Sequence, residues 1–164
     1  MTMTIPTEEE CMKLLNEYNP KLINHSVFMK DVALKIANII ERRGLQVNKD
    51  LLIAGALLHD IKKSSGDDKH NILGKEFVEE KGYPEVGGII ETHFFGTNPE
   101  TTEEKIVFYA DKRVNPGSVL VSVQKRMDYL VDMYNIEEEK VQPWLNQVQE
   151  IEKELFGENG ERLL

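Results

Sequence analysis

The fold is decided by the stretch LLIAGALLHD, residues 51–60. Its first eight residues are apolar or small on every side of a helix, and Asn48 stands where it can cap that helix. A helix that is apolar all round belongs in the centre of a domain. The sequence therefore predicts a buried central helix that leads directly into His59 and Asp60.

Helical periodicity extends over most of the remaining chain. Thr7 and Glu10 have the spacing of a capping box, which predicts a short helix that ends near Tyr18. Residues 119–123 are rich in β-branched side chains and could form a strand, but later apolar residues continue a helical period, so a helix is favoured. Further helices are expected from Pro20 to Gly44, His70 to Lys81, Pro84 to His93 and over residues 137–156, and Thr102 is expected to cap a helix that reaches Asp111. The predicted fold class is all-α, a single helical bundle of about seven or eight helices.

The length and composition fit one domain in a reducing compartment. A chain of 164 residues with 40% hydrophobic residues can bury a sizeable core. We expect one domain over residues 1–164, with its motifs in 20–135 and a C-terminal helix, 136–157, packed on them. The sequence shows no secretory signal and no apolar run of the ~18–20 residues that span a bilayer. Cys11 has no second cysteine to pair with, so a cytoplasmic protein away from membranes is expected.

The charge balance restricts the partners. A formal net charge of -9 repels nucleic-acid backbones, and the sequence lacks a broad basic footprint. Acidity does not exclude a small phosphorylated substrate, because bound metal ions or local cations set the field inside a pocket. We therefore expect a phosphorylated small molecule and no nucleic acid. The amphipathic C-terminal helix also allows a homodimer.

All four histidines stand at or near predicted helix ends. They are His25, His59, His70 and His93. One such histidine is most often an ordinary core or helix-end residue with a satisfied hydrogen bond. Four of them can point into one shared space, and this favours a metal site.

Two aspartates follow apolar helical segments, at Asp60 and Asp111. A buried ionised carboxylate is very unfavourable without a cation, a metal or several donors. A divalent ion would satisfy these carboxylates together with the imidazoles. The alternative is simple ion pairing, of Asp60 with Lys63 and of Asp111 with Lys112 or Arg113.

The order of these residues resembles a known family. His25, then His59-Asp60, then Asp111 is similar to the H…HD…D pattern of the HD superfamily of metal-dependent phosphohydrolases. The run HDIKK that begins at His59 resembles the HDIGK form, with Lys62 where glycine is usual. Over roughly residues 25–126, the chain looks most like the branch that hydrolyses symmetrical dinucleoside tetraphosphates.

The resemblance implies a ligand set and a reaction. One metal would be held by His25, His59, Asp60 and Asp111, and a second by His70 and His93 with Asp60 bridging. One or two divalent ions are implied, and these donors suit Fe, Mn or similar ions better than Ca, with Zn, Co, Ni or Mg as other options. A metal-activated hydroxide would hydrolyse a phosphate ester or phosphoanhydride of a nucleotide or dinucleoside polyphosphate. Asp60 and Lys63 are the expected catalytic residues, and substrate contacts are expected from Lys63, Lys62, Lys112 and Arg113.

Other interpretations stay open. The same six ligands resemble those of di-iron HD-type oxygenases, and a metal or nucleotide sensor without catalysis is a third option; Lys63 favours phosphate chemistry. The loop of residues 64–69 either closes over substrate or simply connects two helices. Phe94 and Phe95 either stack on a base or fill a core edge, and Trp144 is expected in the core or at an interface.

Overall fold

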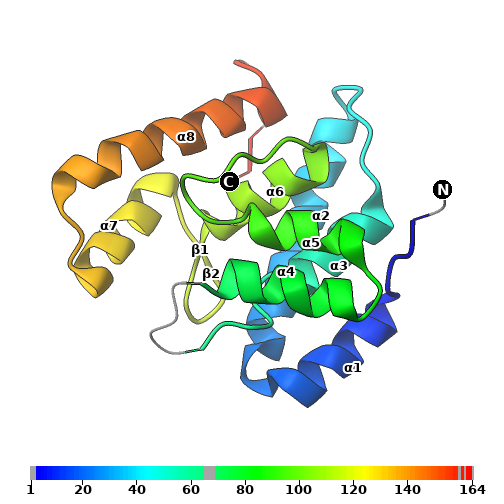
Figure 1. Ribbon diagram of the computed structural model, residues 1–164. Coiled ribbons are helices and arrows are strands. Elements are labelled where there is room, and N and C mark those ends of the chain that lie inside the picture. The colour runs from blue at the N-terminus through cyan, green and yellow to red at the C-terminus, as the bar shows by residue number, and fades with distance from the viewer. Residues whose placement is uncertain (1–2, 65–68, 159, 161, 164) are drawn as a thin grey trace.

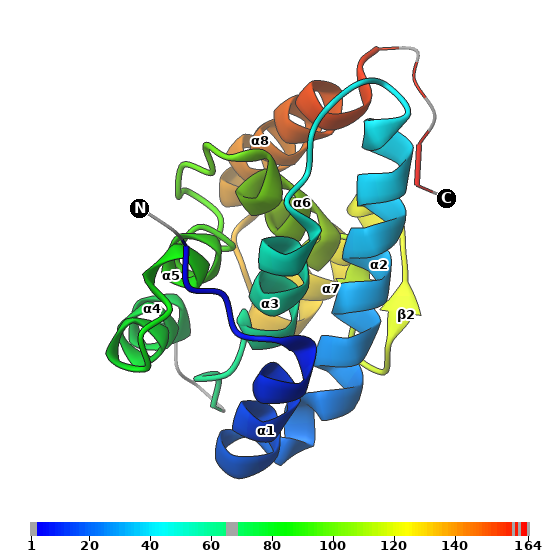
Figure 2. The ribbon, with the colours of Figure 1, turned by 90° about the vertical axis from the view of Figure 1, so that its right-hand side faces the viewer.

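Helix α3 (Lys49–Leu58) lies in the middle of the structure, between α2, α5 and α6 (Figure 2). Its side chains at Leu52, Ala56 and Leu57 are fully buried, as an all-round apolar helix requires. The Asn48 side chain accepts a hydrogen bond from the Leu51 N–H and so caps the first turn. The predicted central helix is therefore confirmed.

The computed structural model describes residues 3–64, 69–158, 160 and 162–163. Within them the fold is all-α, as predicted, apart from one very short hairpin (Figure 1). Residues 65–68 of the loop that was considered as a cover for substrate lie outside the described residues. The elements other than α3 are α1 (Glu8–Tyr18), the 3₁₀ helix η1 (Pro20–Leu22), α2 (Ile23–Glu41), α4 (His70–Glu80), α5 (Pro84–Glu91), α6 (Thr102–Asp111), β1 (Val114–Asn115), β2 (Val119–Leu120), α7 (Val123–Tyr134) and α8 (Glu138–Phe156).

The helices pack in two groups around α3. Helices α4 and α5 lie against each other on one side, and α2 and α6 pack together on the other. Helix α8 packs on α6 and α2, and α7 projects beside it to form one end of the molecule (Figure 1). Among the described residues, no helix is both long enough and apolar enough to cross a bilayer.

The segment after α6 corrects the prediction of a helix over residues 119–123. Val114 pairs with Leu120 and Asn115 with Val119, as two antiparallel strands. The turn between them contains Gly117 with φ +86°, a conformation that glycine adopts without strain. The helical spacing of apolar residues corresponds to a helix only from Val123 onward, where α7 begins after its capping residue Ser122.

The caps of α7 and α6 are formed by side chains directly before each helix begins. The Ser122 hydroxyl accepts from the Lys125 N–H at the start of α7. Thr101, not the predicted Thr102, caps α6 and forms a capping box with Glu104. The correction is one residue long and follows from the reciprocal Thr–Glu hydrogen bonds.

Candidate metal centre

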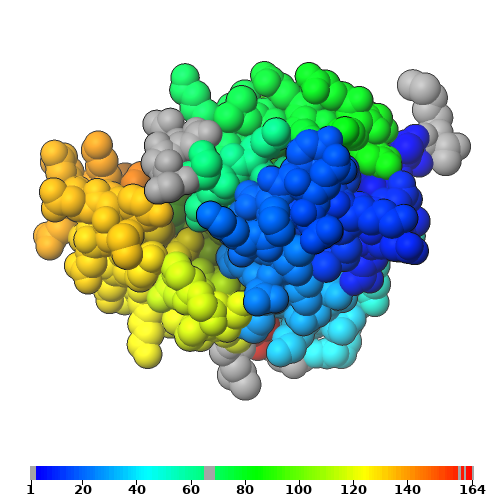
Figure 3. Space-filling view, turned by 90° about the horizontal axis from the view of Figure 1, so that it is seen from below, coloured from blue at the N-terminus to red at the C-terminus, as the bar shows by residue number. Residues whose placement is uncertain are grey.

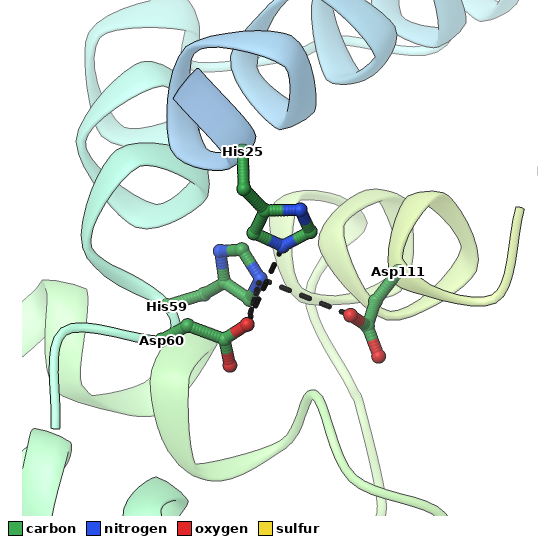
Figure 4. A group of neighbouring side chains, drawn as sticks. All are labelled: His25, His59, Asp60 and Asp111. Carbon is green, nitrogen blue, oxygen red and sulfur yellow. Dashed lines mark ion pairs between the residues drawn. The ribbon is translucent and has the colours of Figure 1, made fainter. Parts of the chain in front are cut away.

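Five helix ends supply the side chains of one buried cluster. His25 projects from the first turn of α2, His59 and Asp60 follow the end of α3, His70 begins α4, His93 follows α5, and Asp111 is the last residue of α6. Figure 4 shows four of them pointing toward one another from α2, α3 and α6. The structure therefore brings together all six residues that the sequence pattern singled out.

Asp60 lies at the centre and faces two histidine pairs with its two oxygens. Its Oδ2 is 3.4 Å from His25 Nε2 and 3.2 Å from His59 Nε2. Its Oδ1 is 3.0 Å from His70 Nε2 and 3.2 Å from His93 Nε2. The carboxylate is 3% exposed, so it meets these imidazoles rather than water. One carboxylate is thus shared between two sets of donors.

Asp111 completes the first of these sets. Its Oδ1 is 3.8 Å from His59 Nε2. Within each set, the candidate ligand atoms lie within 4.8 Å of one another. The sets are His25, His59, Asp60 and Asp111, and then Asp60, His70 and His93.

Backbone carbonyls fix the ring orientation of two of the histidines. His59 Nδ1 is 2.7 Å from the Ala56 carbonyl oxygen, and His93 Nδ1 is 2.5 Å from that of Ile90. A carbonyl only accepts, so each Nδ1 carries the proton and each Nε2 presents a lone pair to the cluster. This second hydrogen bond is the usual arrangement of a metal-binding histidine.

The donor set fits a cation. In the described part of the chain, the buried His59 Nε2 has no hydrogen-bond partner. Its lone pair faces the Asp60 carboxylate, and the Nε2 atoms of His70 and His93 lie 3.3 Å apart. Lone pairs at such distances repel unless a positive charge lies among them. The residues present therefore fit divalent ions held by imidazole and carboxylate ligands.

The two aspartates remain ionised. Burial raises the pKa of Asp60, but the surrounding imidazoles of His59, His25 and His70 outweigh it and hold the pKa well below its usual range. Burial likewise raises the pKa of Asp111, yet the cations Lys112 and Arg126 lower it further than burial raises it. The cluster keeps both carboxylates ready to bind a cation.

Lys112 lies behind Asp111 and holds it in place. Its buried ammonium donates to Asp111 Oδ2 at 2.7 Å and to the His93 carbonyl oxygen at 2.6 Å. The same Nζ lies 4.6 Å and 4.5 Å from the ring centroids of Phe95 and Phe108. The pairing of Asp111 with Lys112 is therefore confirmed. This ion pair is present together with the contact between Asp111 and His59, so it is not the whole explanation of the buried carboxylate.

The other predicted phosphate contacts occupy different places. Lys63 and Lys62 line the cavity beside the cluster, and Lys62 Nζ lies 4.7 Å from the Phe77 ring centroid. Arg113 is buried and does not line that cavity. Its guanidinium donates to the Tyr109 hydroxyl and to the backbone carbonyls of Val121 and Leu163. Arg113 thus ties the C-terminal segment to α6, and the structure does not bring it to the site.

The cluster opens into a cavity of about 1320 Å³ between the helix ends and α7. In Figure 3, α7 and the N-terminal helices lie on opposite sides of a hollow. Trp144 stacks on Phe95, with ring centroids 4.7 Å apart, and lines this cavity, so it does not lie in the core, which was one of the two places expected for it. Six of the chain's twelve aromatic residues line the cavity: Tyr18, Phe94, Phe95, Tyr129, Tyr134 and Trp144.

Sequence reasoning missed one charged residue of the cavity, Arg126 on α7. It shares the cavity-facing side of α7 with Tyr129, Leu130 and Met133, at positions i, i+3, i+4 and i+7. A single arginine on an otherwise apolar helical stripe is a signal that the sequence contains. Nothing in the sequence showed that this stripe faces the metal cluster.

Comparison with known proteins identifies the family. The HD domain model matches residues 22–115, more than half of the chain. The chain is 28% identical to an uncharacterised protein of Methanocaldococcus jannaschii, over 73% of this chain and 85% of that protein. It is 32% identical to the dihydroneopterin 2',3'-cyclic phosphate phosphodiesterase of the same organism, over 69% of this chain and 55% of that protein.

A further relative, 30% identical, is the tRNA (cytidine(56)-2'-O)-methyltransferase of Picrophilus torridus, with 76% of this chain and 40% of that protein covered. The chain thus spans about half or less of the two relatives that are named for an activity. No solved structure matches. The matched family segment contains five helix ends that converge on the His/Asp cluster. The chain therefore belongs to the HD domain family of metal-dependent phosphohydrolases.

Proposed function

We propose that the chain hydrolyses a phosphate ester of a nucleotide or a similar heterocyclic compound, at a centre of two divalent ions. The observation that carries the proposal is the position of Asp60, whose two oxygens face separate histidine pairs at 3.0–3.4 Å. A carboxylate with this environment is suited to bridge two ions. His25, His59 and Asp111 would complete the first ion's ligands, and His70 and His93 those of the second.

The donor chemistry favours Fe, Mn or a similar ion. The ligands are imidazoles and carboxylates, and the Cys11 thiol lies in the hydrophobic core with no exposed surface. Mixed nitrogen and oxygen donors suit such ions better than Ca. When bound, two ions supply a hydroxide near neutral pH and offset the charge on the phosphoryl oxygens.

The chain's own residues would orient the substrate. Lys63 and Lys62 stand at the cavity wall directly after the His59-Asp60 pair, where ammonium groups attract the phosphate. Phe94 packs edge-on against the rings of His70 and His93, with centroids 4.4 Å and 4.8 Å away, and so limits water around the second histidine pair. These side chains place the phosphate beside the metal centre.

The rest of the cavity supports a substrate with a flat ring. Half of the chain's aromatic residues line it, and aromatic faces favour planar heterocycles. Its volume of about 1320 Å³ exceeds the roughly 300–1,000 Å³ of ordinary small-molecule sites. The phosphodiesterase relative is named for dihydroneopterin 2',3'-cyclic phosphate, a heterocycle that carries a phosphate. Nucleotides, cyclic phosphates and dinucleoside polyphosphates are therefore the compounds to test first.

The experiment combines metal analysis with a substrate screen. We expect about two ions per chain, and hydrolysis with Mn or Fe that exceeds that with Ca. Asp60→Asn should remove both ions and lower kcat/KM by more than about 100-fold, since even residues behind metal ligands cost 10–100-fold when mutated. Asp50→Asn is the matched control, because Asp50 is an exposed carboxylate at the other end of α3.

Several outcomes would contradict the proposal. Full hydrolysis by Asp60→Asn would exclude the shared carboxylate from the reaction. Oxygen consumption with bound iron, and no phosphate release from any compound, would instead indicate the oxygenase chemistry. Bound metal without either activity would indicate a sensor.

A further inference from the structure

Arg126 brings a guanidinium to a cavity that is otherwise lined by lysines among its cations, and it does so from helix α7. It lies in the second turn of α7 and is partly buried. Tyr129, Leu130 and Met133 line the cavity from the same helix face. In the described part of the chain, Arg126 is the only arginine that lines this cavity.

The guanidinium of Arg126 is poorly satisfied by the protein itself. Nη1 donates to Asn115 Oδ1 at 3.4 Å, which is long for a hydrogen bond. The buried Nε has no hydrogen-bond partner among the described residues, and no described carboxylate forms an ion pair with Arg126. A guanidinium offers five donors in a planar fork, so most of its capacity is available to a ligand.

The other cations of the cavity are placed differently. The Lys112 ammonium already donates to Asp111 and to the His93 carbonyl, and it lies between two phenyl rings. Lys62 Nζ lies over the Phe77 ring. Lys63 is exposed to solvent, where the attraction between an ammonium and an anion is weak. Lys21 is exposed as well, so among the described cations of this cavity Arg126 is the one that combines partial burial with a buried N–H that has no hydrogen-bond partner.

Arg126 opens onto the same cavity as the metal cluster. Among the residues that line this cavity with Arg126 are Asp60, His70, His93 and Asp111. A phosphate bound at the metal centre would therefore occupy a cavity whose wall also carries this guanidinium. Arginine matches phosphate geometry because two of its N–H groups can bind two oxygens at once.

We propose that Arg126 is a substrate-binding residue whose guanidinium holds the non-bridging oxygens of the substrate's phosphate group. The inference rests on the proposed function and deepens it, because it adds a bidentate contact from α7 to the attraction that Lys62 and Lys63 exert on the phosphate. Helix α7 then supplies both kinds of recognition: Arg126 for the phosphate, and Tyr129 with its apolar neighbours for the organic part of the substrate.

The test uses Arg126→Gln and Arg126→Lys in the metal-loaded protein, with inorganic phosphate as the probe. Arg126→Gln should weaken phosphate binding in calorimetry by about 10- to 100-fold, the effect of losing a hydrogen bond to a charged group. It should raise KM more than it lowers kcat, with metal content and the unfolding midpoint unchanged. Arg126→Lys should recover part of the affinity, because it keeps the charge and loses the fork. Lys125→Gln, an exposed neighbour on α7, is the control and should leave phosphate binding unchanged.

Two results would overturn the inference. One is phosphate binding by Arg126→Gln that equals that of the wild-type protein. The other is equal loss of the fold or of metal in both Arg126 variants, which would make Arg126 a structural link to Asn115. Phosphate binding needs no turnover, so its failure is separate from failure of the proposed function. A wild-type protein that binds phosphate through Arg126 but hydrolyses no compound would refute only the proposed hydrolysis.

Discussion

Gly55→Ala tests whether the contact between α3 and α5 sets the spacing of the metal ligands. A Cβ atom at Gly55 would lie 2.6 Å from Ile89 Cδ1 and 2.7 Å from Ile89 Cγ2. Carbon atoms normally approach to about 3.5–4.0 Å, so the two helices must separate by about 1 Å. Gly55 precedes His59 by one turn, and Ile89 precedes His93 by one turn. The separation would therefore lengthen the 3.2 Å contact between Asp60 and His93.

The magnitude follows from two opposing effects. Alanine is more favourable than glycine inside a helix by about 1 kcal/mol. Overpacking of a well-packed core costs about 1–3 kcal/mol. We therefore expect the free energy of unfolding to fall by about 1 kcal/mol, and affinity for an ion at His93 to fall by about 10-fold or more.

Denaturant unfolding and metal titration would measure both effects. Gly88→Ala is the control for metal binding, because its Cβ would crowd the Glu104 carboxylate of the α6 capping box, at 2.9 Å, and not α3, so the affinity for an ion at His93 should stay unchanged. In an Ile89→Ala background the two closest atoms are gone and only the Cβ atom at position 89, 3.1 Å away, remains, so Gly55→Ala should cost clearly less stability than in the wild-type protein. If Gly55→Ala stabilises the protein equally in both backgrounds, the close helix contact is not what positions His93.

Three further predictions concern single side chains. Lys112→Met should lower the free energy of unfolding by about 3–5 kcal/mol in urea titrations, because it leaves the Asp111 carboxylate buried without its ammonium. Thr101→Ala should cost about 1 kcal/mol in the same assay by removing the α6 cap, whereas Thr101→Ser should not. Burial raises the pKa of Cys11 from 9.0 to about 12, so the folded state keeps a proton that the unfolded state loses. Stability should then fall as pH rises from 9 toward 12, and Cys11→Ala should flatten that part of the pH profile.

The sequence predicted what depends on neighbours along the chain. Capping residues such as Asn48 and Thr7, and the all-round apolar pattern of residues 51–58, determine local structure directly. The His59-Asp60 pair was informative because an apolar helix cannot end in a carboxylate without a compensating group. Together with the helix-end positions of the other histidines and of Asp111, and with the resemblance to the HD pattern, this pair allowed the six clustered residues to be named from the sequence.

What the sequence could not give depends on pairing between distant segments. Val114 and Leu120 pair only because a turn reverses the chain between them, and the apolar period of the next helix obscured that turn. Arg113 stands two residues after Asp111, yet its guanidinium donates to the carbonyl of Leu163 and does not line the cavity. Arg126 is farther from every ligand in sequence, and the packing of α7 brings it to the site. Separation in sequence from a metal ligand did not predict which cationic side chains line the cavity, because long side chains can point in opposite directions from one loop.

Five helices converge on the cluster around Asp60, so the measured stability of the protein should depend on the concentration of metal ions in solution. An ion that binds only the folded chain adds about 4 kcal/mol to stability when its free concentration is a thousand times its dissociation constant. Ions at Asp60 would cross-link α2 through α6 in this way. A melting temperature measured after treatment with a chelator would then report depletion of the ion, and a variant judged unstable under those conditions could be sound once the ion is restored.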